Sequence, residues 1–178
     1  MFKKLSLELG GKNPALIFAD CDWDKMMRTV VQSSFSNQGQ ICLCGSRILI
    51  EKSIYEKFKT EFVARVQKLQ VGDPMDEHSK QGAVVSKLHY DKILACIETA
   101  EQEGGTILLG GEAVHPEGRC AGGYFVAPTI IEGLGANCKT NLEEIFGPVV
   151  TLQSFETDEE ALQLANCSDY GLAATVWT

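Results

Sequence analysis

The run ALIFADCDWDKMMRTVVQSSFSNQGQICLCGSRILI, residues 15–50, joins two short apolar segments through a helical pattern. Residues 15–18 and 48–50 are apolar runs of the kind found in strands that a sheet buries on both faces. Asp22 precedes a helical pattern, in which the apolar positions are Trp23, Met26, Met27, Val30 and Val31. Strand, helix and strand in this order predict a parallel β–α–β unit.

The same alternation continues along the rest of the chain. Ser53-Ile54-Tyr55-Glu56 has the pattern of a capping box and predicts a helix that follows it. Further helices are predicted over residues 86–103 and from Thr157, and further strands over residues 106–109, 125–131, 149–155 and 172–177. The Gly- and Pro-containing residues 110–123 predict a surface loop. We therefore expect an α/β fold, a parallel sheet covered by helices.

Two side chains in this pattern are candidates for chemistry. Cys42 lies in the polar, glycine-broken loop 37–47, where backbone amides can favour the thiolate that attacks a carbonyl carbon. Glu8 stands between Leu7 and Leu9, and is a candidate base for activating the water that hydrolyses a thioester. Taken alone, each has a simpler interpretation: Cys42 as a small buried apolar side chain and Glu8 as part of an exposed strand face. These residues in isolation leave both interpretations open.

Three segments resemble signatures of the aldehyde dehydrogenase superfamily and occur in that family's order. They are Leu-Glu-Leu-Gly-Gly-Lys-Asn-Pro at residues 7–14, Asn-Gln-Gly-Gln-Ile-Cys at 37–42 and Glu-Glu-Ile-Phe-Gly-Pro-Val at 143–149. The separation of Glu8 and Cys42, 42 − 8 = 34 residues, also fits the family. Similarity extends through residues 71–74, 124–129 and 170–173, so it covers the whole chain.

The resemblance implies a role for each matching residue. Cys42 matches the nucleophile, which forms a thiohemiacetal and then a thioester, and whose backbone N–H contributes to the oxyanion hole. Glu8 matches the general base, and its presence favours hydrolysis to a free acid over transfer to coenzyme A. Glu144 matches the carboxylate that holds the nicotinamide ribose, and Phe146 the aromatic side chain beside the nicotinamide. Further cofactor contacts are implied at Gln81, Leu9 and Gly10.

The resemblance also predicts the domain organisation. Residues 1–9 are expected to end the NAD-binding domain, and residues 10–178 to form a catalytic α/β domain that is incomplete at both ends. Residues 105–111 lack the Lys-Ser/Thr of a phosphate-binding loop, and the sequence contains no Gly-x-Gly-x-x-Gly. NAD is the implied cofactor, and NADP stays open because the residues that read the 2′-position are expected upstream. The alternative is a catalytically incompetent short form that acts only as an interaction module.

Net charge and cysteine content limit the classes of partner and the compartment that we expect. The net charge of −8 gives no electrostatic reason to bind nucleic acid or an anionic membrane. Seven cysteines without paired spacing favour neither a disulfide scaffold nor a metal site, so we expect a reducing, cytoplasmic compartment. The resemblance implies a small aldehyde substrate and a homo-oligomeric parent enzyme, a dimer or tetramer. Residues 42–47 and 82–87 are most similar to the branch that acts on 2-aminomuconic semialdehyde in tryptophan catabolism, with retinal or another aldehyde as the alternative.

Overall fold

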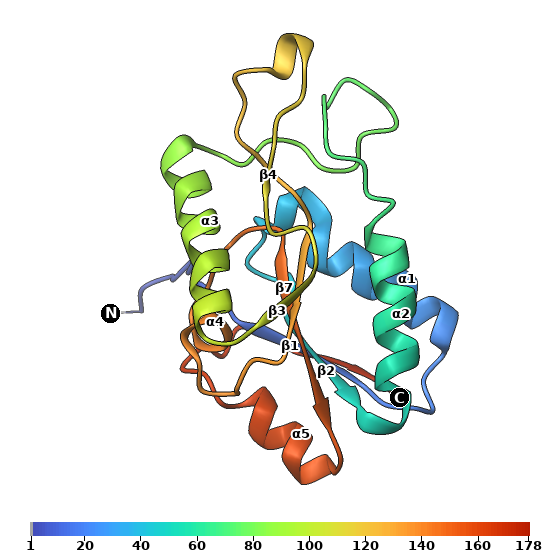
Figure 1. Ribbon diagram of the computed structural model, residues 1–178. Coiled ribbons are helices and arrows are strands. Elements are labelled where there is room, and N and C mark those ends of the chain that lie inside the picture. Colours follow the sequence, from blue (N-terminus) through green and yellow to red (C-terminus); the bar gives the residue numbers. More distant parts are fainter. Residues whose placement is uncertain (1) are drawn as a thin grey trace.

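A six-stranded sheet with helices on both faces forms the centre of the computed structural model, which describes residues 2–178 (Figure 1). The strand order is β3-β6-β7-β2-β1-β8. The strands are β1 (Asn13–Ile17), β2 (Gly45–Glu51), β3 (Thr106–Leu109), β6 (Thr129–Glu132), β7 (Val149–Phe155) and β8 (Thr175–Trp177). All neighbours are parallel except β3, which pairs with β6 in the antiparallel direction at one edge. The predicted α/β class is confirmed, and the sheet is mostly rather than wholly parallel.

The predicted β–α–β unit is present. β1 pairs with β2 in parallel, and α1 (Trp23–Phe35) connects them. The Asp22 side chain caps α1 by accepting a hydrogen bond from the Lys25 N–H at 3.1 Å. Ile48 and Ile50 of β2 face one apolar cluster and Leu49 faces another, so both faces of this strand are buried.

The helices divide between the two faces of the sheet. α1 and α2 (Tyr55–Val66) cover one face, where Met26, Phe58 and Phe62 pack against the sheet. The other face is covered by α3 (Lys87–Gln102), α4 (Lys139–Leu142) and α5 (Asp158–Ala165), as Figure 1 shows. Short 3₁₀ helices lie at Ser36–Gly39, Lys52–Ile54 and Gly118–Cys120. The connecting loops lie at the ends of the strands, and these loops carry the candidate residues.

The single strand predicted over residues 125–131 is wrong, because the structure divides it. Pro128 has no N–H to donate, and the chain leaves one sheet for another at this point. β5 (Phe125–Val126) pairs with β4 (Ala113–Val114) in a separate two-stranded sheet, whereas β6 joins the main sheet. The loop predicted over residues 110–123 therefore contains a short strand.

The capping box predicted at residues 53–56 is also wrong. The Ser53 hydroxyl donates to Glu51 Oε1 at 2.5 Å, upstream of the helix, instead of accepting from the first helical turn. A 3₁₀ turn at Lys52–Ile54 intervenes, and α2 begins at Tyr55 without a side-chain cap. The helix itself is present because Phe58, Phe62 and Val66 still bury one face.

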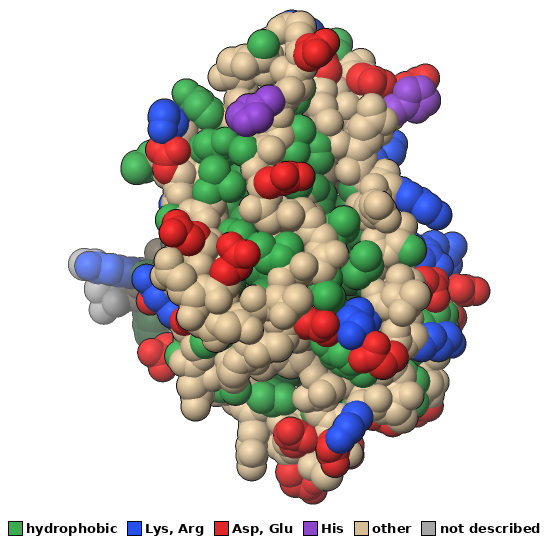
Figure 2. Space-filling model, viewed as in Figure 1, with side chains coloured by type: hydrophobic (Ala, Val, Ile, Leu, Met, Phe, Trp, Pro, Cys, Tyr) green, Lys and Arg blue, Asp and Glu red, His purple; other side chains and the backbone are tan. Residues whose placement is uncertain are grey.

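The surface mixes charges of both signs. On the face drawn in Figure 2, Lys and Arg side chains lie among Asp and Glu side chains. No helix within residues 2–178 has the length and hydropathy needed to cross a membrane.

Candidate active site

Three loops meet at one edge of the sheet. Residues 8–11 precede β1, residues 40–42 precede β2 and residues 144–146 precede β7. Since these strands are parallel neighbours in the order β7-β2-β1, their amino ends lie side by side. Together the loops line an open pocket of about 520 Å³, whose lining residues are Glu8, Leu9, Gly10, Gln40, Ile41, Cys42, Glu144 and Phe146. Every predicted site residue except Gln81 therefore lies at this pocket.

The Cys42 loop follows directly from the end of α1. After Phe35 the chain turns sharply, with Asn37 and Gln38 in the left-handed region at φ 50° and 57°. Gly39 follows at φ 68°, and a Cβ at this position would lie 2.1 Å from the Gly147 carbonyl oxygen. Only glycine permits this approach, which brings the start of the Cys42 loop against Gly147.

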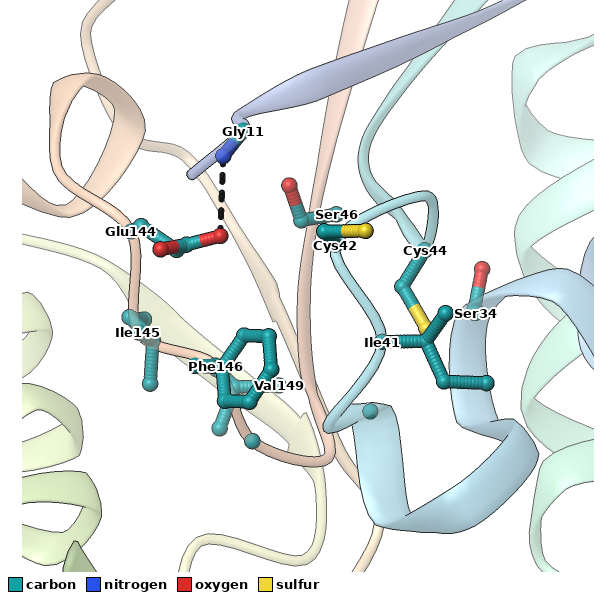
Figure 3. Close-up of a pocket in the computed structure, with 12 residues that line it drawn as sticks. Gly11, Ser34, Ile41, Cys42, Cys44, Ser46, Glu144, Ile145, Phe146 and Val149 are labelled. Carbon is teal, nitrogen blue, oxygen red and sulfur yellow. Dashed lines mark hydrogen bonds between the residues drawn. The ribbon is translucent and has the colours of Figure 1, made fainter. Parts of the chain in front are cut away.

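Glu144 reaches across the pocket to the segment before β1. Its Oε1 accepts a hydrogen bond from the Gly11 N–H at 2.8 Å, the dashed line in Figure 3. A Cβ on Gly10 would come within 2.7 Å of Glu144 Oε2, so glycine lets the carboxylate lie against this backbone without moving aside. The contact joins residues 133 apart in sequence and fixes Glu144 at the pocket.

Two side chains of α3 hold the segment that carries Glu144 and Phe146. Phe146 adopts a left-handed backbone at φ 60°, a strained conformation for an aromatic residue. Its carbonyl oxygen lies 2.6 Å from His89 Nε2, and Lys92 Nζ donates to the Glu144 carbonyl oxygen at 3.1 Å. Nothing local in the sequence marks His89 or Lys92, because their partners lie more than 50 residues away on another loop.

Glu8 lies at the open mouth of the pocket. It is exposed, and its neighbours Leu7 and Leu9 are 66% and 57% exposed, so these leucines do not bury the carboxylate. Residues 2–10 belong to no strand or helix. The carboxylate is therefore solvated, but it is not on the exposed strand face of the simpler interpretation, and its role as a base stays a prediction.

Gln81 lies away from the pocket. Its side chain is 3% exposed, and Nε2 donates to the Phe35 carbonyl oxygen at 2.8 Å and to the Lys80 carbonyl oxygen at 3.0 Å. It therefore binds one of the last carbonyl groups of α1, which a helix cannot satisfy internally. Within residues 2–178 its contacts are structural, and the implied ribose contact stays a prediction.

Buried basic side chains support the segment before β1. Arg47 donates to the Lys12 carbonyl oxygen at 3.0 Å and to the Leu164 and Ala165 carbonyl oxygens at the end of α5. Lys12 is only 2% exposed, and burial, followed by the nearby Arg47 charge, lowers its pKa to about 8. The glycines that contact Glu144 therefore lead directly into a buried, rigid part of the fold.

The lowered pKa of Lys12 predicts a rise in stability with pH. Between pH 8 and 10.5 the unfolded lysine keeps its proton while the folded one loses it, so the free energy of unfolding increases over this window, by about 3 kcal/mol. Lys12→Met should abolish this rise, whereas Lys68→Met, at an exposed lysine, should retain it. Urea unfolding at pH values below 8 and near 10.5 measures both effects. If the free energy of unfolding of Lys12→Met rises with pH as it does in the unaltered chain, the assignment of this rise to Lys12 is wrong.

Comparison with known proteins gives one consistent result. The model of the aldehyde dehydrogenase family matches residues 1–178. The chain is 47% identical over 179 residues to 2-aminomuconic semialdehyde dehydrogenase of Danio rerio and 46% identical over 178 residues to that of Homo sapiens. It is 40% identical over 181 residues to 4-trimethylaminobutyraldehyde dehydrogenase A of Danio rerio.

A solved structure agrees with the sequence comparison. The crystal structure of betaine aldehyde dehydrogenase from Staphylococcus aureus in complex with NAD⁺ superposes with a TM-score of 0.90 at 41% identity, covering 96% of this chain and 34% of that one. The matches to the curated relatives named above cover 99% of this chain and 35–37% of those proteins. The chain thus spans little more than a third of their length.

Proposed function

Because this chain belongs to the aldehyde dehydrogenase family, we propose that it carries the acylation half of a site that oxidises an aldehyde to a carboxylic acid with NAD⁺. The full-length enzyme, meaning a protein of its relatives' length that contains this chain, would perform the whole reaction. The observation that supports this proposal is that Cys42, Glu8, Glu144 and Phe146 line one open pocket. A thiol, a carboxylate base and a cofactor contact are thereby within reach of one small substrate.

The residues present fit the nicotinamide end of NAD. One carboxylate oxygen of Glu144 accepts from Gly11, and the carboxylate borders the open pocket, where it can also accept from ribose hydroxyls. Phe146 offers an aromatic face to the same pocket. When bound, the cofactor supplies the hydride acceptor. The full-length enzyme should have a higher kcat/KM with NAD than with NADP. A higher value with NADP would replace NAD as the proposed cofactor.

The proposed reaction begins at Cys42. Its Sγ attacks the aldehyde carbon to form a thiohemiacetal, whose oxyanion can accept from the Cys42 N–H, for which no acceptor is found among residues 2–178. Loss of hydride from that carbon leaves a thioester. Glu8 then takes a proton from water, the hydroxide adds to the thioester carbon, and the Cys42 thiolate leaves. The sum is aldehyde, NAD⁺ and water to acid, NADH and a proton.

For the substrate, we propose 2-aminomuconic semialdehyde. Its support is the identity of 46–47% to the dehydrogenases of Danio rerio, Mus musculus, Bos taurus and Homo sapiens that carry that substrate in their names. The full-length enzyme should have a higher kcat/KM for this aldehyde than for 4-trimethylaminobutyraldehyde, betaine aldehyde or retinal. A preference for any of the other three would replace the substrate and leave the reaction class in place.

A second candidate function is that the 178-residue chain acts only by associating with longer chains. We predict that the isolated chain oxidises aldehydes with NAD⁺ at a rate at least about 10³-fold below that of the full-length enzyme, because it supplies one wall of the cofactor site and little of the orientation that hydride transfer needs. NADH absorbance measures this with both proteins at equal Cys42 concentration. Turnover by the isolated chain at a rate ordinary for dehydrogenases would contradict the prediction.

We further propose that the full-length enzyme is cytoplasmic and homo-oligomeric. All seven cysteines are free, which suits a reducing compartment. The oligomer is proposed from the family alone. Cell fractionation and the mass of the full-length enzyme by light scattering test the two statements separately.

A further inference from the structure

Asn13, at the start of β1, is hydrogen-bonded to the loop that carries Cys42. It is 4% exposed, and its Nδ2 donates to the Cys42 carbonyl oxygen at 2.7 Å and to the Cys44 carbonyl oxygen at 3.0 Å. Its Oδ1 accepts from the Ala173 N–H at 3.1 Å. Both N–H groups of the carboxamide are thus used on one turn of the nucleophile loop.

These bonds restrain the backbone on both sides of the Cys42 Cα. On the amino side, the Ile41 carbonyl oxygen accepts from the Cys44 N–H at 3.0 Å. Because a trans peptide places N–H and C=O on opposite sides, this bond sets the direction of the Cys42 N–H. On the carboxyl side, Asn13 holds the Cys42 carbonyl oxygen. The loop therefore has a fixed orientation at the residue where the thiol and the oxyanion donor must both face the pocket.

The surrounding backbone is shaped to admit this contact. The pairing register of β1 with β2 shifts between Asn13 and Pro14, an irregularity of the kind that redirects a side chain near functional sites. At Gly11, a Cβ would lie 2.9 Å from both the Cys42 carbonyl oxygen and Asn13 Oδ1. Gly11 and Asn13 thus form one close contact with the loop.

We propose that Asn13 is a positioning residue for Cys42: its carboxamide holds the Cys42 and Cys44 carbonyl oxygens toward β1, and so keeps the thiol and the Cys42 N–H oriented into the pocket. This inference rests on the proposed role of Cys42 as nucleophile. Carbonyl oxygens carry partial negative charge, and holding them on the far side of the loop favours a thiolate and a developing oxyanion on the near side.

A matched control is available in Asn141 of α4. It is fully buried, its Nδ2 donates to the Gly135 carbonyl oxygen at 2.9 Å, and its Oδ1 accepts from the Thr151 hydroxyl at 2.7 Å. It resembles Asn13 in burial and in bonding at both ends of the carboxamide, but it holds a different loop. Asn141→Ala therefore reports the cost of losing a buried asparagine by itself.

The experiment measures alkylation of the folded 178-residue chain by iodoacetamide. Peptide mass spectrometry gives the rate at Cys42 relative to Cys120, a thiol in the 3₁₀ helix Gly118–Cys120. Asn13→Ala should lower this ratio about tenfold, because the loop loses the orientation that activates the thiol. Asn13→Ser, which keeps one donor for two carbonyl oxygens, should fold and show a smaller decrease. Asn141→Ala should leave the ratio unchanged at a comparable loss of stability in urea.

The outcomes separate this inference from the proposed function. If Cys42 of the unaltered chain reacts no faster than Cys120, the nucleophile assignment fails and the positioning role fails with it. If Cys42 is reactive and both Asn13 variants retain or exceed the original ratio, only the positioning role is overturned. An equal decrease in Asn141→Ala would show that the effect is general destabilisation, and would also overturn it.

Discussion

Replacing Cys42 with serine is expected to lower aldehyde oxidation by the full-length enzyme by on the order of 10⁴-fold or more. At neutral pH a cysteine is partly thiolate, whereas a serine hydroxyl needs a base to remove its proton. The substitution keeps the size of the side chain, so the loop bonds of Asn13 to the backbone remain. Stopped-flow measurement of the first turnover of NADH, with mass spectrometry of the peptide carrying Cys42, reports the missing acyl adduct.

Cys44 and Cys120 supply the controls for this result. The Cys44 Sγ lies 3.9 Å from the Ser36 carbonyl oxygen, on the α1 side of the loop, and burial raises the pKa of its thiol. Cys44→Ser should therefore retain most of the first-turnover rate, and Cys120→Ser should retain all of it. If Cys44→Ser loses acylation while Cys42→Ser stays active, the nucleophile is Cys44 and not Cys42.

Replacing Glu8 with glutamine is expected to separate the two halves of the reaction. The amide has the shape of the carboxylate but cannot take a proton from water, so the thioester should persist while its formation continues. We expect a first turnover of NADH close to normal, followed by steady-state turnover slowed about 10²–10⁴-fold. The acylated Cys42 peptide should then accumulate in the mass spectrum.

An added nucleophile tests the cause of that slow step. Hydroxylamine attacks a thioester without help from a general base. Added to acylated Glu8→Gln after free aldehyde has been removed, with which it would form an oxime, it should release the acyl group as a hydroxamate and regenerate the Cys42 thiol, whereas Cys42→Ser should yield no hydroxamate. Glu117→Gln, at an exposed glutamate that does not line the pocket, should behave as the unaltered enzyme. Normal steady-state turnover in Glu8→Gln would remove Glu8 from the mechanism.

Much of the fold is predictable from local patterns. The apolar runs at residues 15–18, 48–50 and 149–155 correspond to β1, β2 and β7, and the helical pattern after Asp22 corresponds to α1. These predictions succeed because the apolar runs have the length of strands, whereas the apolar positions after Asp22 recur at helical spacing. The strand at residues 106–109 was also located, but its antiparallel direction was not, since direction depends on which strand it meets.

The failures have equally specific causes. Pro128 is visible in the sequence, yet nothing local shows that residues 125–126 pair with residues 113–114 in a second sheet. The Ser53 hydroxyl could accept from a backbone N–H of the following helix or donate to the Glu51 carboxylate. It donates to Glu51 because Ser53 lies in a 3₁₀ turn, Lys52–Ile54, that precedes the helix.

For the site, the amino-acid sequence alone identifies the candidate groups: a cysteine in a glycine-broken loop, a glutamate before paired glycines, and the segment that contains Glu144 and Phe146. The order of the segments is a further signal: each group precedes an apolar run that forms a parallel strand. Parallel neighbours bring their amino ends to one edge, and that alone collects residues from three distant parts of the chain.

The contacts that make these groups a site arise only in the folded chain. Asn13 with Cys42, Glu144 with Gly11 and His89 with Phe146 join residues 29, 133 and 57 positions apart. Hydrogen bonds of this kind depend on the direction of single carbonyl and amide groups, which the strand order and loop geometry set after the chain has folded. Hydrophobic periodicity carries no record of those directions, so the sequence specifies the chemical groups and the sheet determines how they meet.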